Sequence, residues 1–144
     1  MRFWDSSALL PLLVEESGSA EVNRLFAEDN EIAIWWGTPT DCWSALARRE
    51  REAGWPTVTT DEALANLQKV MARAHEVLST AAVRACSRRL LFTHSLRAAD
   101  ALQLAAAVVF GATEVAELDF VTLDEALAQA ARREGFRVIP IATA

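Results

Sequence analysis

The sequence predicts an α/β fold in which helices cover both faces of a parallel sheet of four or five strands. Short apolar segments typical of strands alternate with longer segments whose apolar residues recur at helical spacing. Strands that alternate with helices pair in parallel through right-handed crossovers, which place the helices on both sides of the sheet. The length of 144 residues suits one core, so we expect a single domain over residues 1–144.

Five segments are predicted as strands because each is a short apolar run. The third has the weakest signal, and the last is expected to be buried. The predicted strands are residues 2–4, 32–36, 76–78, 120–122 and 137–141.

The segments between the strands are predicted as helices. Thr38, Ser95 and Thr122 are expected to be N-caps, because a hydroxyl at that position can accept a hydrogen bond from a free backbone N–H. The hydroxyl of Thr122 could also orient a ligand water. The helix at residues 96–110 is apolar nearly all round, so it is expected to be central. The predicted helices are residues 7–14, 19–28, 39–53, 59–75, 80–90, 96–110 and 123–133.

Composition is that of an ordinary globular protein. Apolar residues make up 52% and charged residues 24%, which excludes the disordered, collagenous and disulfide-stapled classes. The first residues contain no apolar signal core, and the longest uninterrupted apolar run, residues 104–110, is too short to cross a bilayer. We therefore expect a cytoplasmic protein with no membrane segment.

Cysteine and histidine are not spaced as zinc ligands. Cys42 and Cys86 are far apart and lack a CxxC spacing, so both are expected to be small buried hydrophobic residues. His75 and His94 are equally far from a zinc-finger pattern, and each is expected at the surface or in a hydrogen bond.

The net charge of −6 argues against a general binder of phosphate backbones, which usually has a basic surplus. Arginines nevertheless occur in two local groups that could line a groove, or could equally lie on solvated helix faces. The first group is Arg48, Arg49 and Arg51, and the second is Arg84, Arg88, Arg89 and Arg97.

Four aspartates recur at strand ends or helix starts: Asp5, Asp41, Asp100 and Asp124. Carboxylates at the carboxyl ends of strands, and on helices beside them, can converge on the crevice where open α/β sheets bind ligands. Converging carboxylates repel one another unless a hard cation neutralises them, so the pattern predicts Mg²⁺ or Mn²⁺.

Helix capping is the alternative explanation for most of these acids. Asp5 can cap the helix that follows it, and Asp41 can form a capping box with Thr38. Asp124 suits the positive end of a helix, and nearby Asp119 could take the strand edge instead, although Asp124 is better placed. Asp100 is the hardest to explain in this way, because aspartate is a poor helix former and its neighbours look buried.

Four segments, taken in order, resemble the PIN-domain proteins of the VapC toxin type. The resemblance covers nearly the whole chain, and its most specific part is the third segment followed by the TLD sequence. The segments are DSSALL at 5–10, DCWSALAR at 41–48, LRAADALQLA at 96–105 and VTLD at 121–124.

This resemblance implies a PIN-like three-layer α/β/α sandwich with a mostly parallel central sheet, and a Mg²⁺- or Mn²⁺-dependent endoribonuclease. In the leading assignment, Asp5 and Asp100 hold the principal ion. The family's small hydroxyl beside the first acid matches Ser7, or Ser6 as the alternative. The family's remaining residues fall on Asp41 and Asp124, which complete the acidic site, and on Thr122, which precedes the last acid.

The resemblance also implies partners. These are an RNA substrate, a small cognate antitoxin whose arginine-bearing tail enters the acidic pocket, and a second copy of the chain in a homodimer. Most of the five tryptophans are expected in the core, although any of them could anchor a partner. They are Trp4, Trp35, Trp36, Trp43 and Trp55.

The chain departs from the family at Asp41, where glutamate is usual. Because aspartate is shorter by one methylene, its carboxylate could retract from the metal or bind through water. This departure and the acidic net charge favour one alternative, a non-catalytic interaction module whose acidic pocket binds a basic partner segment. A phosphatase with an aspartyl nucleophile after the first strand is disfavoured, because the second acid it needs two positions later is Ser7 here.

Overall fold

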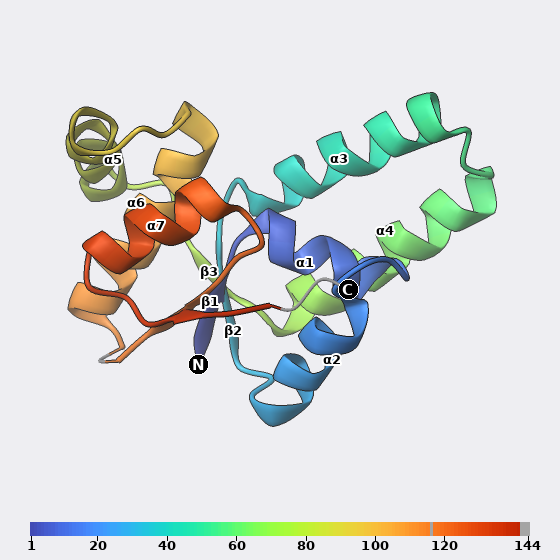
Figure 1. Ribbon diagram of the computed structural model, residues 1–144, viewed down its shortest axis with the longest axis horizontal. Coiled ribbons are helices and arrows are strands. Elements are labelled where there is room, and N and C mark those ends of the chain that lie inside the picture. Colours follow the sequence, from blue (N-terminus) through green and yellow to red (C-terminus); the bar gives the residue numbers. More distant parts are fainter. Residues whose placement is uncertain (116, 142–144) are drawn as a thin grey trace.

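The structure, a computed structural model, describes residues 1–115 and 117–141, which form one sheet with helices on both sides (Figure 1). All strand pairs are parallel, and the strand order is β3-β2-β1-β4-β5. This confirms the predicted α/β fold and the upper of the two predicted strand numbers. The strands are β1 (Arg2–Trp4), β2 (Ile32–Trp35), β3 (His75–Val77), β4 (Asp119–Val121) and β5 (Val138–Ile139).

Two groups of helices complete a three-layer α/β/α sandwich. One face of the sheet packs against α1 (Ser6–Leu13), α2 (Ser19–Glu28), α3 (Thr38–Ala53) and α4 (Thr57–Arg73). The other face packs against α5 (Ala81–Thr93), α6 (Ala98–Thr113) and α7 (Glu125–Arg133). Across the two described ranges, no helix combines the length and apolar character that crossing a bilayer requires.

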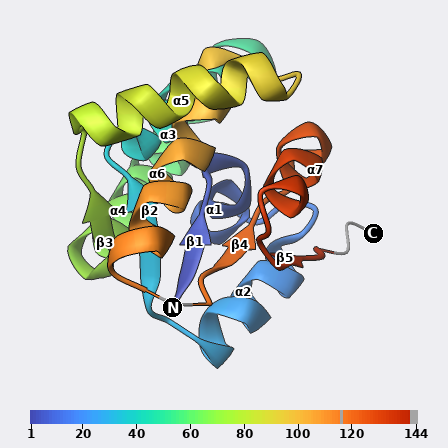
Figure 2. The same cartoon turned by 90° about the vertical axis from the view of Figure 1, so that its left-hand side faces the viewer.

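Neighbouring strand residues point to opposite faces and so belong to different cores. In β1, Phe3 packs with α5, α6 and α7, whereas Trp4 packs with the helices of the other layer. All four residues of β2 are buried, as expected for a central strand covered on both sides. The predicted central helix, α6, lies in the first of these cores, and α5 packs across it (Figure 2).

Helices α3 and α4 form an arm that projects from one side of the sandwich (Figure 1). The chain turns at the tip of this arm, where Gly54 has a φ of +65°, a left-handed conformation that favours glycine. We call this pair of helices the α3–α4 arm.

The predicted start of α6 is wrong by two residues. Its N-cap is Arg97, with no side-chain cap bond, rather than Ser95. The reason is that His94 still belongs to the end of α5, since its backbone N–H donates to the carbonyl of Leu90. Residues 95–97 therefore form the connection between α5 and α6, and α6 begins only at Ala98.

The expectation that most tryptophans fill the core holds for three of the five, one of which is only partly buried. Trp4 and Trp35 are buried, and Trp55 is partly buried. By contrast, Trp36 is 55% exposed just beyond β2, and Trp43 is 48% exposed on the α3–α4 arm. Trp36 follows the end of β2 and Trp43 lies on the α3–α4 arm, so neither ring is buried between the sheet and a helix layer.

The cysteines and histidines largely follow expectation. Cys42 is buried, as predicted, but Cys86 is only partly buried. His75 is exposed, whereas His94 is buried and its Nε2 lies 2.7 Å from Glu134.

Candidate functional site: four aspartates at the carboxyl edge of the sheet

The strand order defines a crevice next to β1. From β1 the chain builds β2 and β3 on one side, and it later adds β4 and β5 on the other side. The order therefore reverses at β1 and β4, and open α/β sheets bind ligands at such a point, outside the carboxyl ends of the strands. Asp5 directly follows β1, and Thr122 directly follows β4. The backbone N–H of Asp5 donates to the carbonyl of Val121 at 3.2 Å, so the two strand ends are adjacent.

Asp5 is a buried carboxylate without a basic partner. Its side chain is only 3% exposed, and within the described residues no lysine, arginine or histidine forms an ion pair with it. Its Oδ1 accepts a hydrogen bond from the hydroxyl of Ser7 at 2.8 Å, and its Oδ2 accepts one from the Ser7 backbone N–H at 3.3 Å. Burial raises the pKa of Asp5 to about 6, even though hydrogen bonds from Ser7 and Thr122 act in the opposite direction.

Ser7 and Thr122 lie side by side and join the two strand ends. Their hydroxyl oxygens are 3.2 Å apart, and the Ser7 hydroxyl also accepts a hydrogen bond from the backbone N–H of Leu123 at 2.9 Å. The Thr122 hydroxyl accepts one from the backbone N–H of Asp124 at 3.0 Å. These bonds fix the loop after β4 against the start of α1, which places both predicted hydroxyls beside Asp5.

The predicted N-cap role of Thr122 is wrong, and Asp124 has that role instead. Asp124 Oδ1 accepts a hydrogen bond of 2.8 Å from the backbone N–H of Leu127. The Thr122 hydroxyl is instead occupied by Ser7 and by the turn at Asp124. Asp124 therefore has a capping function whatever else it does.

Asp41 is held by a residue that the sequence did not single out. Asp41 Oδ2 accepts a hydrogen bond of 3.0 Å from Nε2 of Gln103, a buried residue of α6. The predicted capping box with Thr38 is absent, because the Thr38 hydroxyl donates to Oε1 of Gln103 at 3.0 Å and the N-cap is Gly37. Burial raises the pKa of Asp41, and the Gln103 hydrogen bond partly offsets this rise.

Gln103 was overlooked because it is uncharged and lies in an apolar helix. The available signal was its position: a polar amide at a place expected to be buried, one helical turn after Asp100.

Asp100 connects the group electrostatically. It lies in the first turn of α6 and is half-buried. Burial is the main cause that raises its pKa, and the negative charges of Asp124 and Asp41 raise it further, while Arg97 lowers it. Asp41 and Asp5 in turn both help to raise the pKa of the buried Cys42 thiol, to about 12, after burial itself. Asp100 therefore interacts through charge with Asp41 and Asp124, and Asp5 shares with Asp41 an influence on the Cys42 thiol.

The four carboxylates do not form a ready ligand set. Within residues 1–115 and 117–141, no three histidine, cysteine, aspartate or glutamate side chains are close enough together to hold a metal ion. One oxygen of Asp41 accepts a hydrogen bond from Gln103, and one oxygen of Asp124 caps α7, so neither oxygen is free for a cation. Like charges also repel when no cation lies between them. The chemistry of the donors nevertheless fits Mg²⁺ or Mn²⁺, which prefer carboxylate oxygens.

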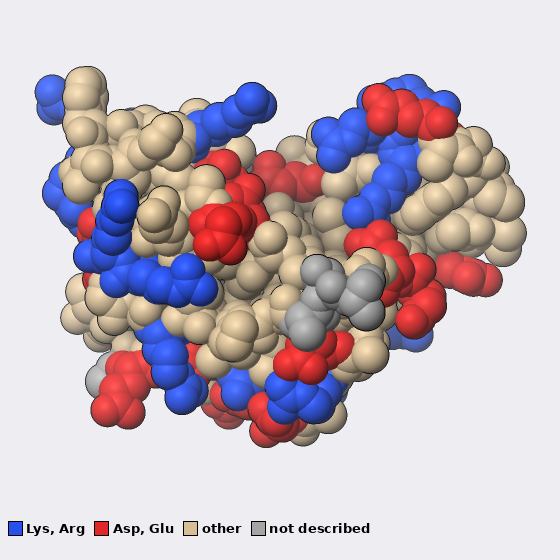
Figure 3. Space-filling model, viewed as in Figure 1, with Lys and Arg blue, Asp and Glu red and all other residues tan. Residues whose placement is uncertain are grey.

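The surface around this site is acidic in the middle and basic at its sides. Figure 3 shows acidic side chains in the hollow between the α3–α4 arm and the side formed by α6 and α7, with basic side chains on either side of it. Two exposed arginines belong to the helix of Asp41 or to the start of the helix of Asp100. Arg97 is the N-cap of the helix that contains Asp100, and Arg48 follows Asp41 along α3.

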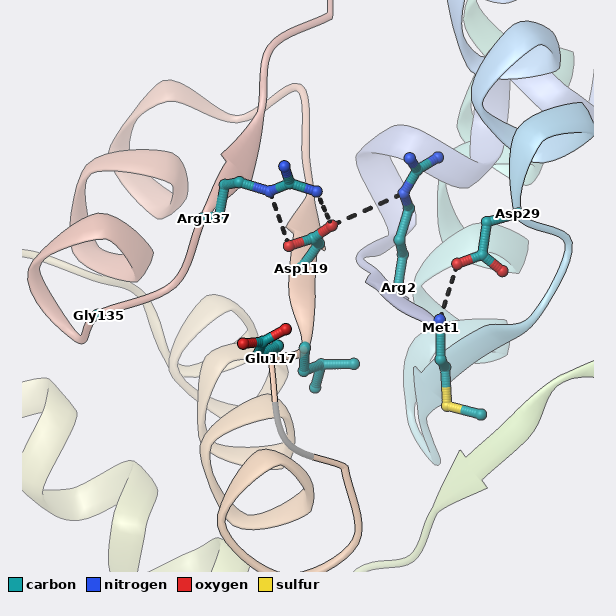
Figure 4. Close-up of a pocket in the computed structure, with 8 residues that line it drawn as sticks. Met1, Arg2, Asp29, Glu117, Asp119, Gly135 and Arg137 are labelled. Carbon is teal, nitrogen blue, oxygen red and sulfur yellow. Dashed lines mark hydrogen bonds and ion pairs between the residues drawn. The ribbon is translucent and has the colours of Figure 1, made fainter.

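A cavity of about 610 Å³ lies at the opposite end of the sheet and is distinct from the acidic site. Figure 4 shows its paired charges: the amino group of Met1 lies 2.7 Å from Asp29, and Asp119 lies between Arg2 and Arg137. Asp119 is therefore occupied by two arginines at the start of β4, which agrees with the preference for Asp124 as the fourth acid.

Comparison with known proteins supports the fold. No protein-family model matches the chain, and no curated protein matches it. Among solved structures, the crystal structure of PAE2754 from Pyrobaculum aerophilum is similar, with a TM-score of 0.65 and 20% sequence identity. The similarity covers 95% of this chain and 82% of that chain, and at this identity it shows a shared fold alone.

Proposed function

We propose that this protein is a Mg²⁺- or Mn²⁺-dependent endoribonuclease of the PIN type that hydrolyses RNA phosphodiester bonds in the cytoplasm. The observation that best supports the proposal is Asp5, a buried carboxylate at the switch point of the sheet that has no basic partner among the described residues. Burying an unpaired carboxylate is unfavourable, so its retention favours a cation as its partner. Asp41 acts together with Asp5 on the Cys42 thiol, and Asp100 in turn interacts through charge with Asp41 and Asp124.

Each side chain has a distinct part in this proposal. Asp5 and Asp100 hold the principal ion, while Asp41 and Asp124 complete the site or orient the attacking water. A bound ion would lower the pKa of that water and stabilise charge on the phosphate oxygens. Ser7 and Thr122 keep the carboxylate of Asp5 in place through the hydrogen bonds between the two strand ends. Arg48 and Arg97 offer positive charge to the neighbouring phosphates of a single RNA strand.

The test is cleavage of RNA by the purified protein with and without Mg²⁺ or Mn²⁺, followed by mapping of the new RNA ends. Asp5→Asn and Asp100→Asn should each abolish metal-dependent cleavage and leave the fold intact. Asp61→Asn, an exposed aspartate on α4, is the matched control and should cleave like the wild type. Undiminished cleavage by both site variants would refute the assignment.

A toxin role follows from the same proposal. We infer that a small antitoxin inhibits the enzyme by inserting an arginine-bearing segment among the four aspartates, and that the enzyme is a homodimer. Coexpression with the product of an adjacent reading frame, followed by measurement of cleavage and of particle mass, tests both inferences.

A second candidate function is a non-catalytic module whose acidic pocket binds a basic partner segment. The spread of the carboxylates favours it, since no ligand set is assembled within the described ranges. A protein that binds a basic peptide tightly, yet neither binds Mn²⁺ nor cleaves RNA, would support the module over the nuclease.

A further inference from the structure

Gln103 connects the two helices that contain Asp41 and Asp100. It lies on α6, one turn after Asp100, and its amide reaches across to α3. The side chain is only 1% exposed, so its polar atoms depend on protein partners rather than on water.

Both ends of the Gln103 amide are satisfied, and this fixes its orientation. The Thr38 hydroxyl, which is also buried, donates to Oε1 at 3.0 Å. Nε2 therefore points the other way and donates to Oδ2 of Asp41 at 3.0 Å. A flipped amide would place its oxygen against a carboxylate, which has no proton to donate when it is ionised. The ionised carboxylate of Asp41 thus selects the orientation in which Gln103 donates to it, and the Thr38 hydroxyl, which can donate or accept, anchors that orientation by donating to Oε1.

The consequence for Asp41 is a fixed carboxylate with one oxygen still available. Within the described part of the chain, Oδ1 of Asp41 has no hydrogen bond, whereas Oδ2 is held. A hydrogen bond from an amide N–H to one carboxylate oxygen restricts the rotamer of the side chain and favours its ionised form. Carboxylates that bind metals in proteins are commonly held by such hydrogen bonds.

We propose that Gln103 is a positioning residue that, fixed by Thr38, holds Asp41 in the orientation needed at the metal site. The inference rests on the proposed metal-dependent function and deepens it. Gln103 itself touches neither metal nor RNA. It acts through Asp41, so its loss should weaken metal binding by the amount typical of partners that support metal ligands, about 10- to 100-fold.

The experiment measures Mn²⁺ affinity of the full chain by electron paramagnetic resonance, without RNA. Gln103→Met keeps the size of the side chain and removes both polar ends, and it should bind Mn²⁺ about 10- to 100-fold more weakly than the wild type. Gln129→Met, at an exposed position of α7, is the matched control and should bind like the wild type. Thermal melting without metal shows whether each variant is folded.

Two further variants separate positioning from a general packing defect. Thr38→Val should weaken Mn²⁺ binding in the same direction, because it removes the donor that anchors Oε1 of Gln103, whereas Thr38→Ser keeps the hydroxyl and should bind like the wild type. In an Asp41→Ala background, Gln103→Met should weaken Mn²⁺ binding no further, since Gln103 then has nothing to position.

Each outcome decides between explanations. If the wild type binds Mn²⁺ and Gln103→Met binds it equally well, the positioning role is wrong while the proposed function stands. An undiminished effect of Gln103→Met in the Asp41→Ala background also overturns the positioning role. If the wild type binds no Mn²⁺ at millimolar concentration, the proposed function fails and the positioning role fails with it.

Discussion

The hydroxyl of Ser7 donates a hydrogen bond of 2.8 Å to Oδ1 of Asp5, and both residues lie at the start of α1, directly after β1. The same hydroxyl accepts the backbone N–H of Leu123 from the other end of the chain. Ser7 therefore supports the buried carboxylate and at the same time fastens the loop after β4.

Replacing Ser7 by alanine should weaken the fold at neutral pH. The variant loses the donor to Asp5 and the acceptor for Leu123. We expect unfolding by urea to show a loss of about 1–3 kcal/mol, because a buried polar group is left unpaired. Ser44→Ala, at an exposed position of α3, should change stability little. Equal stability of wild type and Ser7→Ala would contradict the role given to this hydroxyl.

Asp5 should make metal-free stability depend on pH. The pKa of Asp5 is about 6 in the folded protein and near 3.8 in an unfolded chain. Between these two pH values, the folded state therefore retains a proton that the unfolded state has released. The stabilisation from this proton is complete below about pH 4 and is lost as the pH rises through about 6. Asp5→Asn does not titrate. Its unfolding free energy should therefore gain about 3 kcal/mol relative to wild type between acid and neutral pH.

The control for this measurement is Asp61→Asn, which should follow the wild-type pH profile. If the unfolding free energies of wild type and Asp5→Asn differ by the same amount across this pH range, burial does not raise the pKa of Asp5.

Asp100→Asn should separate metal binding from stability. Removing this charge relieves repulsion from Asp124 and Asp41, so the metal-free variant should melt at or above the wild-type temperature. Addition of Mg²⁺ should raise the melting temperature of the wild type, because an ion that binds only the folded state stabilises that state. The melting temperature of the variant should stay nearly unchanged, since the variant lacks one of the proposed ligands. A variant that responds to Mg²⁺ as the wild type does would remove Asp100 from the ligand set.

Arg48 and Arg97 should contribute to RNA binding without contributing to metal binding. Arg48 follows Asp41 by about two helical turns and shares its face of α3, and Arg97 starts the helix of Asp100. In an Asp5→Asn background that leaves RNA uncut, each arginine-to-alanine change should reduce the salt-dependence slope of binding by about 0.7 per lost phosphate contact. Arg24→Ala on α2, a helix that contains none of the four aspartates, should leave the slope unchanged. If Arg24→Ala lowers the slope while Arg48→Ala and Arg97→Ala leave it unchanged, the RNA binds to another face of the protein.

The sequence predicted the elements of the fold well because its apolar periodicity is strong. Residues 96–110 were apolar enough to predict a central helix. The length predicted one core, whereas in the structure Phe3 and Trp4 point into two cores on opposite faces of the sheet. Strand order could not be read in the same way, since it depends on contacts between segments far apart in sequence.

Polar residues were harder to assign because one hydroxyl has several possible partners. Thr38 and Thr122 both match an N-cap pattern, yet each bonds a residue that only the tertiary structure brings near, Gln103 and Ser7 respectively. The acids were found because charge in an apolar context is conspicuous. Gln103 was missed because an uncharged amide does not stand out in that way.

The bond between Leu123 and Ser7 spans a sequence separation of 116 residues. During synthesis, the ribosome must add and release the residues through Leu123 before Ser7, in the first turn after β1, meets this partner. A nascent chain that ends before β4 has Asp5 but lacks Thr122 and Asp124, so it contains an incomplete constellation. The site proposed around Asp5 therefore cannot form until the residues through Asp124 have been synthesised.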